Sequence, residues 1–220
     1  MVKENSKRKS CVDVFNSFLV CDAEYSGKYE IPRIDGSIDV PEHLVVFSKA
    51  KSCKNLNSWI HFYEDDFQFE RLWRNPQTYL GLFKKYDGVI LPDFSVYRDM
   101  PYVMQIWNIY RSRALGNWLQ KNDIKVIPNI RYGDSRTWKV SCEGVSKGKT
   151  IAVGSHGTIK NTIDRHYFSE GLKYVVNTLS PRNIVVYGTV PDAVFKSYKD
   201  AGINIVQFKS DYSIAHKGVE

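Results

Sequence analysis

The 220-residue sequence lacks the features by which several large protein classes are recognised. It contains no run of about 18 uncharged apolar residues, the minimum for a membrane-spanning helix. Its four cysteines lie far apart without a C-x-x-C pair, which argues against a zinc knuckle or a disulfide-rich scaffold. The basic N-terminal segment leads into a stretch that contains Asp13, so no secretory signal is indicated. We therefore predict a cytoplasmic protein with buried, reduced thiols and no membrane partner.

Several catalytic and nucleotide-binding motifs are also missing. There is no P-loop, no G-x-G-x-x-G, no H-E-x-x-H and no G-x-S-x-G, so ATP, dinucleotide, zinc-protease and α/β-hydrolase functions lack support. The sequence accordingly predicts no cofactor.

The composition is that of an ordinary globular chain with a basic excess. Hydrophobic residues make up 43% and charged residues 25%. The 31 Lys and Arg residues outnumber the 24 Asp and Glu residues, which gives a formal charge of +7. This balance favours a polyanionic partner, and we expect that partner to be nucleic acid, DNA in preference to RNA. Many basic proteins nevertheless bind nothing anionic in particular.

Apolar, β-rich runs alternate with helical patterns along most of the chain. Near-continuous apolarity in these runs predicts strands covered on both faces, as in a parallel sheet. We therefore expect one α/β domain over residues 41–220, with a mainly parallel sheet of six to seven strands. An incomplete TIM-like barrel and an open doubly wound sheet both fit this pattern. Residues 1–40 break the repeat and are expected to form an N-terminal extension packed on the domain. The predicted strands are 44–47, 59–63, 88–91, 125–128, 150–153, 183–187 and 203–208.

Polar residues gather after the predicted strands, where ligands bind in parallel α/β folds. Carboxylates, arginines and a histidine on one rim exceed what loop solubility requires, so this rim is the predicted site. Its members are Glu64, Asp65, Asp66, Asp93, Tyr97, Arg98, Asp99, Asn129, Arg131, Tyr132, Asp134, Ser155 and His156.

Asp93 is the candidate key carboxylate, because it directly follows a buried strand. Glu64 or Asp66 is the candidate acid/base partner. We expect the remaining substrate contacts to come from phosphate-binding, polar and base-stacking side chains. These are Arg98, Arg131, Asn129, Ser155 and His156, with Tyr97 and Tyr132 as stacking rings. Alternatively, Glu64, Asp66 and Asp93 hold Mg²⁺ as in a nuclease, although nothing in the sequence fixes their mutual geometry and we predict no bound metal.

Each of these groups also has a structural interpretation. The acids at 64–66 precede a predicted helix and can cap it. Arg98 can pair with Asp99, and Arg131 can pair with Asp134. The segment 154–157, Gly-Ser-His-Gly, is typical of a backbone anion nest before a helix, while a lone histidine is more often a structural hydrogen-bonder.

Four segments carry a family resemblance: FLVCDAEY at 18–25, HFYEDD at 61–66, PDFSVYRDMP at 92–101 and IPNIR at 127–131. They resemble the DUF4417 family over nearly the whole chain. That family has no assigned chemistry and is frequent on bacterial phages and mobile elements. The resemblance therefore implies a phage-related setting and supplies no catalytic residue.

Two functions from different classes fit the rim. The first is an enzyme acting on a base or its N-glycosidic bond, a DNA glycosylase or base-exchange type, loosely like the tRNA-guanine transglycosylases at fold level. A fixed carboxylate would stabilise the positive charge that develops on the sugar. The second is a non-catalytic phage counter-defence protein that binds a nucleotide signal or a host protein. Several acids on the rim favour the enzyme, because a binder of anions gains nothing from them.

Overall fold

The computed structural model describes residues 13–159 and 161–210, and its parallel strands lie where the apolar runs predict them. The strands are mostly buried, and every pairing between them is parallel. The expectation of an α/β fold with parallel strands is therefore confirmed. These strands are β3 (Leu44–Val46), β4 (Trp59–His61), β5 (Gly88–Ile90), β6 (Val126–Ile127), β7 (Thr150–Gly154), β8 (Asn183–Tyr187) and β9 (Asn204–Phe208).

The strands form two sheets, not one. β3 to β6 make a four-stranded sheet and β7 to β9 a three-stranded sheet, so the expectation of a single sheet of six to seven strands is wrong. Within each sheet the spatial order follows the chain without the reversal that defines a doubly wound fold. The strands in the described part of the chain close no barrel.

The break between the sheets has a visible cause at the beginning of β6 and β7. The N–H of Ser37 donates to the carbonyl of Val126 at 2.9 Å, and the carbonyl of Ser37 accepts from the N–H of Thr150 at 2.9 Å. The main chain of Ser37 therefore lies between the two strands and takes the bonds they would have made with each other.

The two sheets meet at the carboxyl ends of β6 and β7. Pro128 follows β6 and has no N–H to continue the ladder. An isolated bridge joins Asn129 and Ala152, with hydrogen bonds of 2.8 Å from Ile130 N to Ala152 O and 2.9 Å from Ala152 N to Pro128 O. This bridge brings the residues that follow β6 next to Ala152, in the middle of β7.

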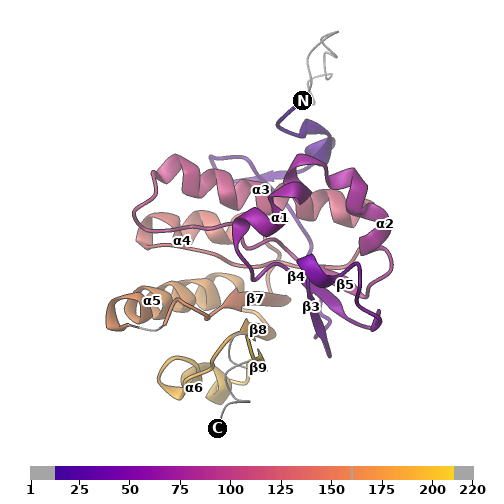
Figure 1. Ribbon diagram of the computed structural model, residues 1–220. Helices are drawn as coiled ribbons and strands as arrows, with labels where there is room; N and C mark the ends of the chain where they lie inside the picture. Colours follow the sequence, from indigo (N-terminus) through magenta and orange to yellow (C-terminus); the bar gives the residue numbers. More distant parts are fainter. Residues whose placement is uncertain (1–12, 160, 211–220) are drawn as a thin grey trace.

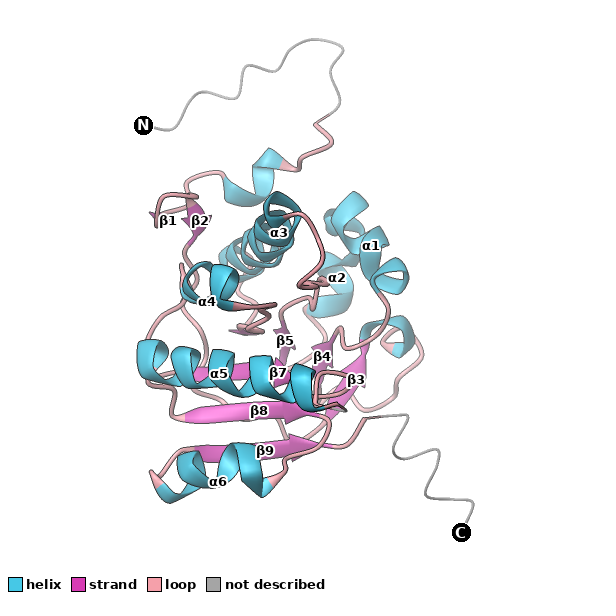
Figure 2. Cartoon of the chain, turned by 90° about the vertical axis from the view of Figure 1, so that its left-hand side faces the viewer, coloured by secondary structure: helices cyan, strands magenta, loops and turns pink. Residues whose placement is uncertain are grey.

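In the view of Figure 1, the first four helices lie above the strands and the last two lie to the left of β7–β9. In the second half of the chain, α5 (Thr162–Leu179) and α6 (Asp192–Asp200) lie along the β7–β9 sheet (Figure 2). Asn161 caps α5 by accepting from Asp164 N, and the helix ends at Ser180, which has a φ of 45° and precedes Pro181. The helices are α1 (Asp66–Arg74), α2 (Leu80–Phe83), α3 (Tyr102–Lys121), α4 (Ser135–Cys142), α5 (Thr162–Leu179) and α6 (Asp192–Asp200), with 3-10 turns at Ser17–Val20, Phe47–Lys49 and Pro76–Tyr79.

Side chains from both sheets share an apolar cluster on the inner side of the strands. Trp59, Ile90, Ile127, Ala152 and Val185 are all buried there, one from each of five consecutive strands. The two sheets therefore curve around one shared interior, although the pairing that joins them is an isolated bridge and not a full ladder. This curvature directs the carboxyl ends of β4 to β8 toward one region.

The first described residues pack on α3. A short antiparallel hairpin, β1 (Tyr25–Ser26) and β2 (Ile31–Pro32), precedes Ser37 and lies against that helix. The expected extension over 1–40 extends in part beyond the described residues, because 1–12 are not among them.

The described cysteines are free thiols in different environments. Cys142 is buried and Cys53 half-buried, but Cys21 is exposed, so the expectation of uniformly buried thiols is wrong. Cys11 lies outside the described residues. Among the helices that the structure describes, none is long and apolar enough to span a bilayer.

Candidate functional site

A cavity of about 1200 Å³ opens at the carboxyl ends of the strands. Glu64, Asp66, Asp93, Arg131 and His156 all line it, although they come from four separate loops. The structure thus brings the acidic candidates, one of the two arginines and the histidine to one place.

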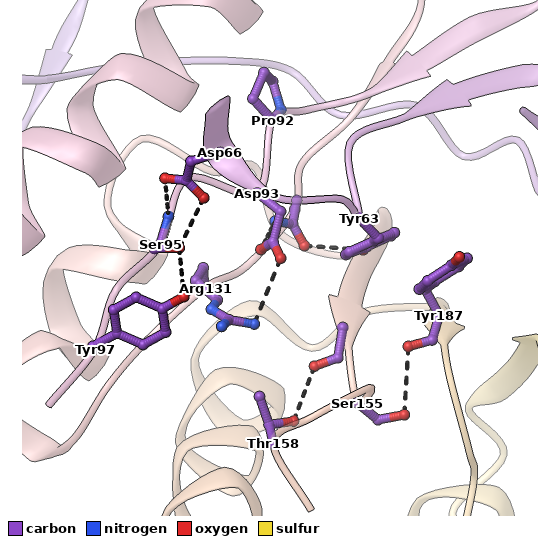
Figure 3. A network of polar contacts seen from close by, with 12 residues as sticks. Tyr63, Asp66, Pro92, Asp93, Ser95, Tyr97, Arg131, Ser155, Thr158 and Tyr187 are labelled. Atoms are coloured by element: carbon purple, nitrogen blue, oxygen red, sulfur yellow. Dashed lines mark hydrogen bonds and ion pairs between the residues drawn. The ribbon is translucent and has the colours of Figure 1, made fainter. Parts of the chain in front are cut away.

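Asp93 lines this cavity and follows β5 after Leu91 and Pro92. Its Oδ1 accepts from Asn129 Nδ2 at 2.7 Å, and its Oδ2 is 3.5 Å from a guanidinium nitrogen of Arg131 (Figure 3). The Asp93 side chain is only 14% exposed. Burial raises the pKa of Asp93, and the negative charge of Asp66 raises it further. The positive charge of Arg131 and the hydrogen bond from Asn129 act in the opposite direction, but the net shift is upward. Asp93 therefore holds a proton more readily than an ordinary aspartate.

A tyrosine fixes the orientation of the amide that contacts Asp93. The hydroxyl of Tyr63 donates to Asn129 Oδ1 at 3.0 Å, so the Asn129 NH₂ group faces Asp93. The Tyr63 ring stacks on that of Tyr187, with centroids 4.7 Å apart and planes at 9°. Burial raises the pKa of Tyr63 well above its usual value, which keeps the phenol protonated as a donor. The result is a fixed chain of polar contacts from Tyr63 through Asn129 to Asp93.

A buried arginine donates a hydrogen bond to the main chain of Asn129. Arg113 on α3 is 1% exposed and donates to the carbonyls of Asn129, at 3.2 Å, and Ser141, at 2.8 Å. No carboxylate of the described residues forms an ion pair with it. Burial lowers the pKa of Arg113 to about 10. A cation kept in this position fixes the loop that carries Asn129 and Arg131.

The acids Glu64 and Asp66 after β4 form hydrogen bonds with serines of neighbouring loops and, among the described residues, none with Asp93. Glu64 accepts from Ser48 N at 3.2 Å, and both oxygens of Asp66 accept from Ser95, at 3.0 Å from its N–H and 2.8 Å from its hydroxyl. Asp65 is the N-cap residue of α1, without a side-chain cap bond. Among the described residues no three His, Cys, Asp or Glu side chains gather as metal ligands, so the geometry does not support the Mg²⁺ interpretation.

Arg98 and Tyr97 face a second cavity, of about 750 Å³, that shares Arg131 and His156 with the first. Arg98 pairs with Asp164 of α5 at 2.5 Å, so the predicted pair with Asp99 is wrong. Tyr97 is 55% exposed, and its hydroxyl lies 3.0 Å from Ser95 Oγ. Tyr97 therefore remains open to a ligand, whereas Arg98 is already paired.

Two rim side chains, the predicted stacking ring Tyr132 and the rim acid Asp134, have structural roles. Tyr132 is largely buried, donates to the carbonyl of Phe168 at 2.9 Å and packs against α5, so its ring is not free to stack on a base. Asp134 caps α4 and pairs with Arg136 at 2.8 Å, so Arg131 does not pair with it. Arg131 turns to Asp93 because that carboxylate is buried beside it.

The segment 154–157 is not the expected anion nest. The N–H groups of Ser155 and His156 both point to the carbonyl of Tyr187, and the Ser155 hydroxyl donates to the carbonyl of Thr189 at 2.7 Å. Ser155 is fully buried, and α5 begins only at Thr162. His156 is exposed and lines both cavities, so of the two predicted contacts only His156 can reach a ligand.

The residue pattern gave no indication of Tyr63, Tyr187, Arg113 and Asp164. Tyr63 and Tyr187 stand at strand ends, the position that directed attention to Asp93, so the same rule applied to aromatic residues would have found them. Arg113 is buried on α3 beside a second buried arginine, Arg111, and two arginines within a helix that also carries a hydrophobic pattern are the signal they leave.

Comparisons with known proteins give one family model and two phage relatives. The family model described as "Domain of unknown function (DUF4417)" matches residues 23–209. The Gene 1 protein of Mycobacterium phage L5 is 32% identical over 180 residues, which cover 80% of this chain and 77% of that protein. The Gene 1 protein of Mycobacterium phage D29 is 31% identical over 166 residues, 74% of this chain and 62% of that protein. No solved structure matches the chain.

Proposed function

The chain belongs to the phage-associated DUF4417 family, and we propose that it is an enzyme that acts on a nucleobase at its N-glycosidic bond, as a glycosylase or base-exchange enzyme. The observation that carries this proposal is Asp93. A buried carboxylate with a raised pKa, oriented by Asn129 and Arg131, lines an open cavity large enough for a nucleoside. Perturbed carboxylates in clefts are typical of catalytic groups.

The chemistry needs one carboxylate near the sugar. As the C1′–N bond breaks, its electron pair leaves with the base and positive charge develops on C1′. Ionised Asp93 would stabilise that charge or form a bond to C1′, and the incoming water or second base would then bond to C1′, with the electron pair of any Asp93–C1′ bond returning to the carboxylate. The departing base needs a proton, which the incoming water or base supplies as it adds to C1′. Asn129 and Arg131 hold the carboxylate in place.

The two cavities suggest how a nucleotide would lie. The base would enter the larger cavity above Asp93, and Tyr97 offers an exposed ring for stacking. The phosphate would lie toward the second cavity, where Arg131, His156 and Arg98 are found. Binding there requires Arg98 to exchange Asp164 for the phosphate. The net charge of +7 favours nucleic acid, in the first place DNA, as the larger substrate.

A second candidate is a non-catalytic counter-defence protein that binds a nucleotide signal or a host protein. One observation favours it: both oxygens of Asp93 are already occupied, by Asn129 and Arg131, as expected of a residue that holds a scaffold together. Under this interpretation the cavity binds its ligand unchanged.

Release of free base from DNA separates the candidates. Wild-type protein is incubated with single-stranded and duplex DNA from phage and host, and released bases are measured by mass spectrometry. We expect Asp93→Asn to lower the rate by about 10²–10³, the usual effect of losing one well-placed electrostatic group. Asp87→Asn, an exposed aspartate at the beginning of β5, is the matched control and should retain full rate. If no base is released while a nucleotide binds, the non-catalytic candidate replaces the enzyme.

A further inference from the structure

The entrance of the larger cavity has a surface that Asp93 chemistry does not require. Phe67, Tyr97 and Met104 line the cavity and are 72%, 55% and 49% exposed, respectively. We call these three side chains the apolar rim. They come from α1, the loop after β5 and α3, so the rim is assembled from three separate elements. Grouped exposed apolar side chains around a concave site are typical of an interaction surface.

The wall beside the apolar rim is acidic, although the chain as a whole is basic. Five carboxylates line the cavity, against the guanidinium groups of Arg111 and Arg131. Both arginines are already paired, with Glu70 at 2.9 Å and with Asp93 at 3.5 Å. The negative charge of the remaining acids is therefore not cancelled from within the cavity.

Those remaining acids are Glu64, Asp65 and Asp66. Glu64 and Asp66 accept hydrogen bonds from the neutral donors Ser48 and Ser95, which orient a carboxylate without neutralising it. The N-terminus of α1 stabilises part of this charge, and that explains why the acids are tolerated. It does not explain the apolar rim next to them.

We propose that the apolar rim and this acidic wall dock a basic segment of a protein partner, one that carries at least one large apolar side chain among its lysines and arginines. The apolar side chain would pack on the apolar rim, and the cations would face the three acids. A phosphate backbone fits the acidic wall poorly, because it would meet Glu64, Asp65 and Asp66 there, and both arginines of the described lining are already paired. A bound segment would cover the entrance, so the partner would control access to Asp93. The inference does not depend on the proposed chemistry.

The test is selection from a displayed library of random 12-residue peptides on wild-type protein, followed by fluorescence anisotropy with the enriched peptides. We expect enriched peptides to carry net positive charge and a large apolar residue. Phe67→Ser should weaken their binding about fivefold or more, as for the loss of a hot-spot contact. Asp65→Asn should weaken it about twofold or more. The matched controls Ile163→Ser and Glu42→Gln change exposed residues away from the cavity and should leave affinity unchanged.

Several results would overturn the proposal. One is enrichment of peptides without net positive charge, and another is binding that Phe67→Ser leaves intact. Loss of single-stranded DNA binding in Phe67→Ser would assign the surface to nucleic acid. A wild-type dimer in sedimentation that Phe67→Ser dissociates would assign it to a second copy of the chain. All four readouts measure binding or assembly, so they stand apart from any failure to release a base.

Discussion

The raised pKa of Asp93 makes stability depend on pH in a direction opposite to that of most aspartates. In the unfolded chain this carboxyl ionises near 3.8, and in the folded protein it does so at higher pH because it is buried. Below pH 3.8 both states hold the proton, so the stabilising contribution is fully present. As pH rises through the folded pKa, the unfolded state has already ionised freely, and the contribution is lost.

Replacing Asp93 with Asn removes this titration while keeping the size of the side chain. The free energy of unfolding of wild type, relative to that of Asp93→Asn, should therefore fall as pH rises from about 3.8 through the folded pKa and then level off. The size of the fall follows from the gap between the folded and unfolded pKa, because a tenfold difference between the two acid constants is worth about 1.4 kcal/mol. Urea unfolding followed by far-UV circular dichroism from pH 2.5 to 8 measures it.

Asp134 supplies a control of opposite sign. Hydrogen bonds from Arg136 lower its pKa, so its contribution is present above 3.8 and lost as pH falls through the folded value. The free energy of unfolding of wild type, relative to that of Asp134→Asn, should thus rise with pH, and the rise should occur at the acidic end of the titration, up to about pH 3.8. If the Asp93 comparison also rises with pH, the ion pair with Arg131 outweighs burial and our reasoning is refuted; a flat comparison would mean that Asp93 is well hydrated.

Three further predictions follow from other contacts. Tyr63→Phe leaves Asn129 Oδ1 buried without its donor and should lower the free energy of unfolding by about 1–3 kcal/mol in urea titrations, whereas an unchanged value would mean that water replaces the phenol. Gly88→Ala places a methyl group 2.5 Å from the Trp59 ring and should cost about 1–3 kcal/mol, seen as a lower Tm; an unaltered Tm would show that the ring can move aside. Binding of random DNA, if nucleic acid is the partner, should weaken steeply between 50 and about 200 mM salt in anisotropy titrations, and absence of binding at low salt would count against that partner.

The positions of the strands and of the site residues could be read from the sequence, because both follow local rules. Apolar runs fix the strands, and the residue after a parallel strand lies at the ligand-binding end. Asp93 was found in this way. The partner of each side chain could not be read, because a pairing depends on distances between loops: Arg131 reaches Asp93 and not Asp134, and Arg98 reaches Asp164 on a helix that begins 64 residues later.

The division into two sheets was also beyond the sequence. It depends on Ser37, a residue outside the strand pattern, whose main chain occupies the space between β6 and β7. Periodicity assigns faces to a strand and says nothing about which backbone lies beside it. For the same reason the segment 154–157 resembles an anion nest in sequence, although its N–H groups are directed to Tyr187.

Because an isolated bridge joins the sheets, the two walls of the cavity can form at different times during synthesis. Asp93, Asn129 and Arg131 belong to the first sheet and the loops around it, whereas Tyr187 and His156 arrive with the second. A nascent chain that has emerged only as far as β6 would carry the carboxylate without the opposite wall of its cavity. Binding of a nucleotide between the two walls would therefore require the second half to have docked.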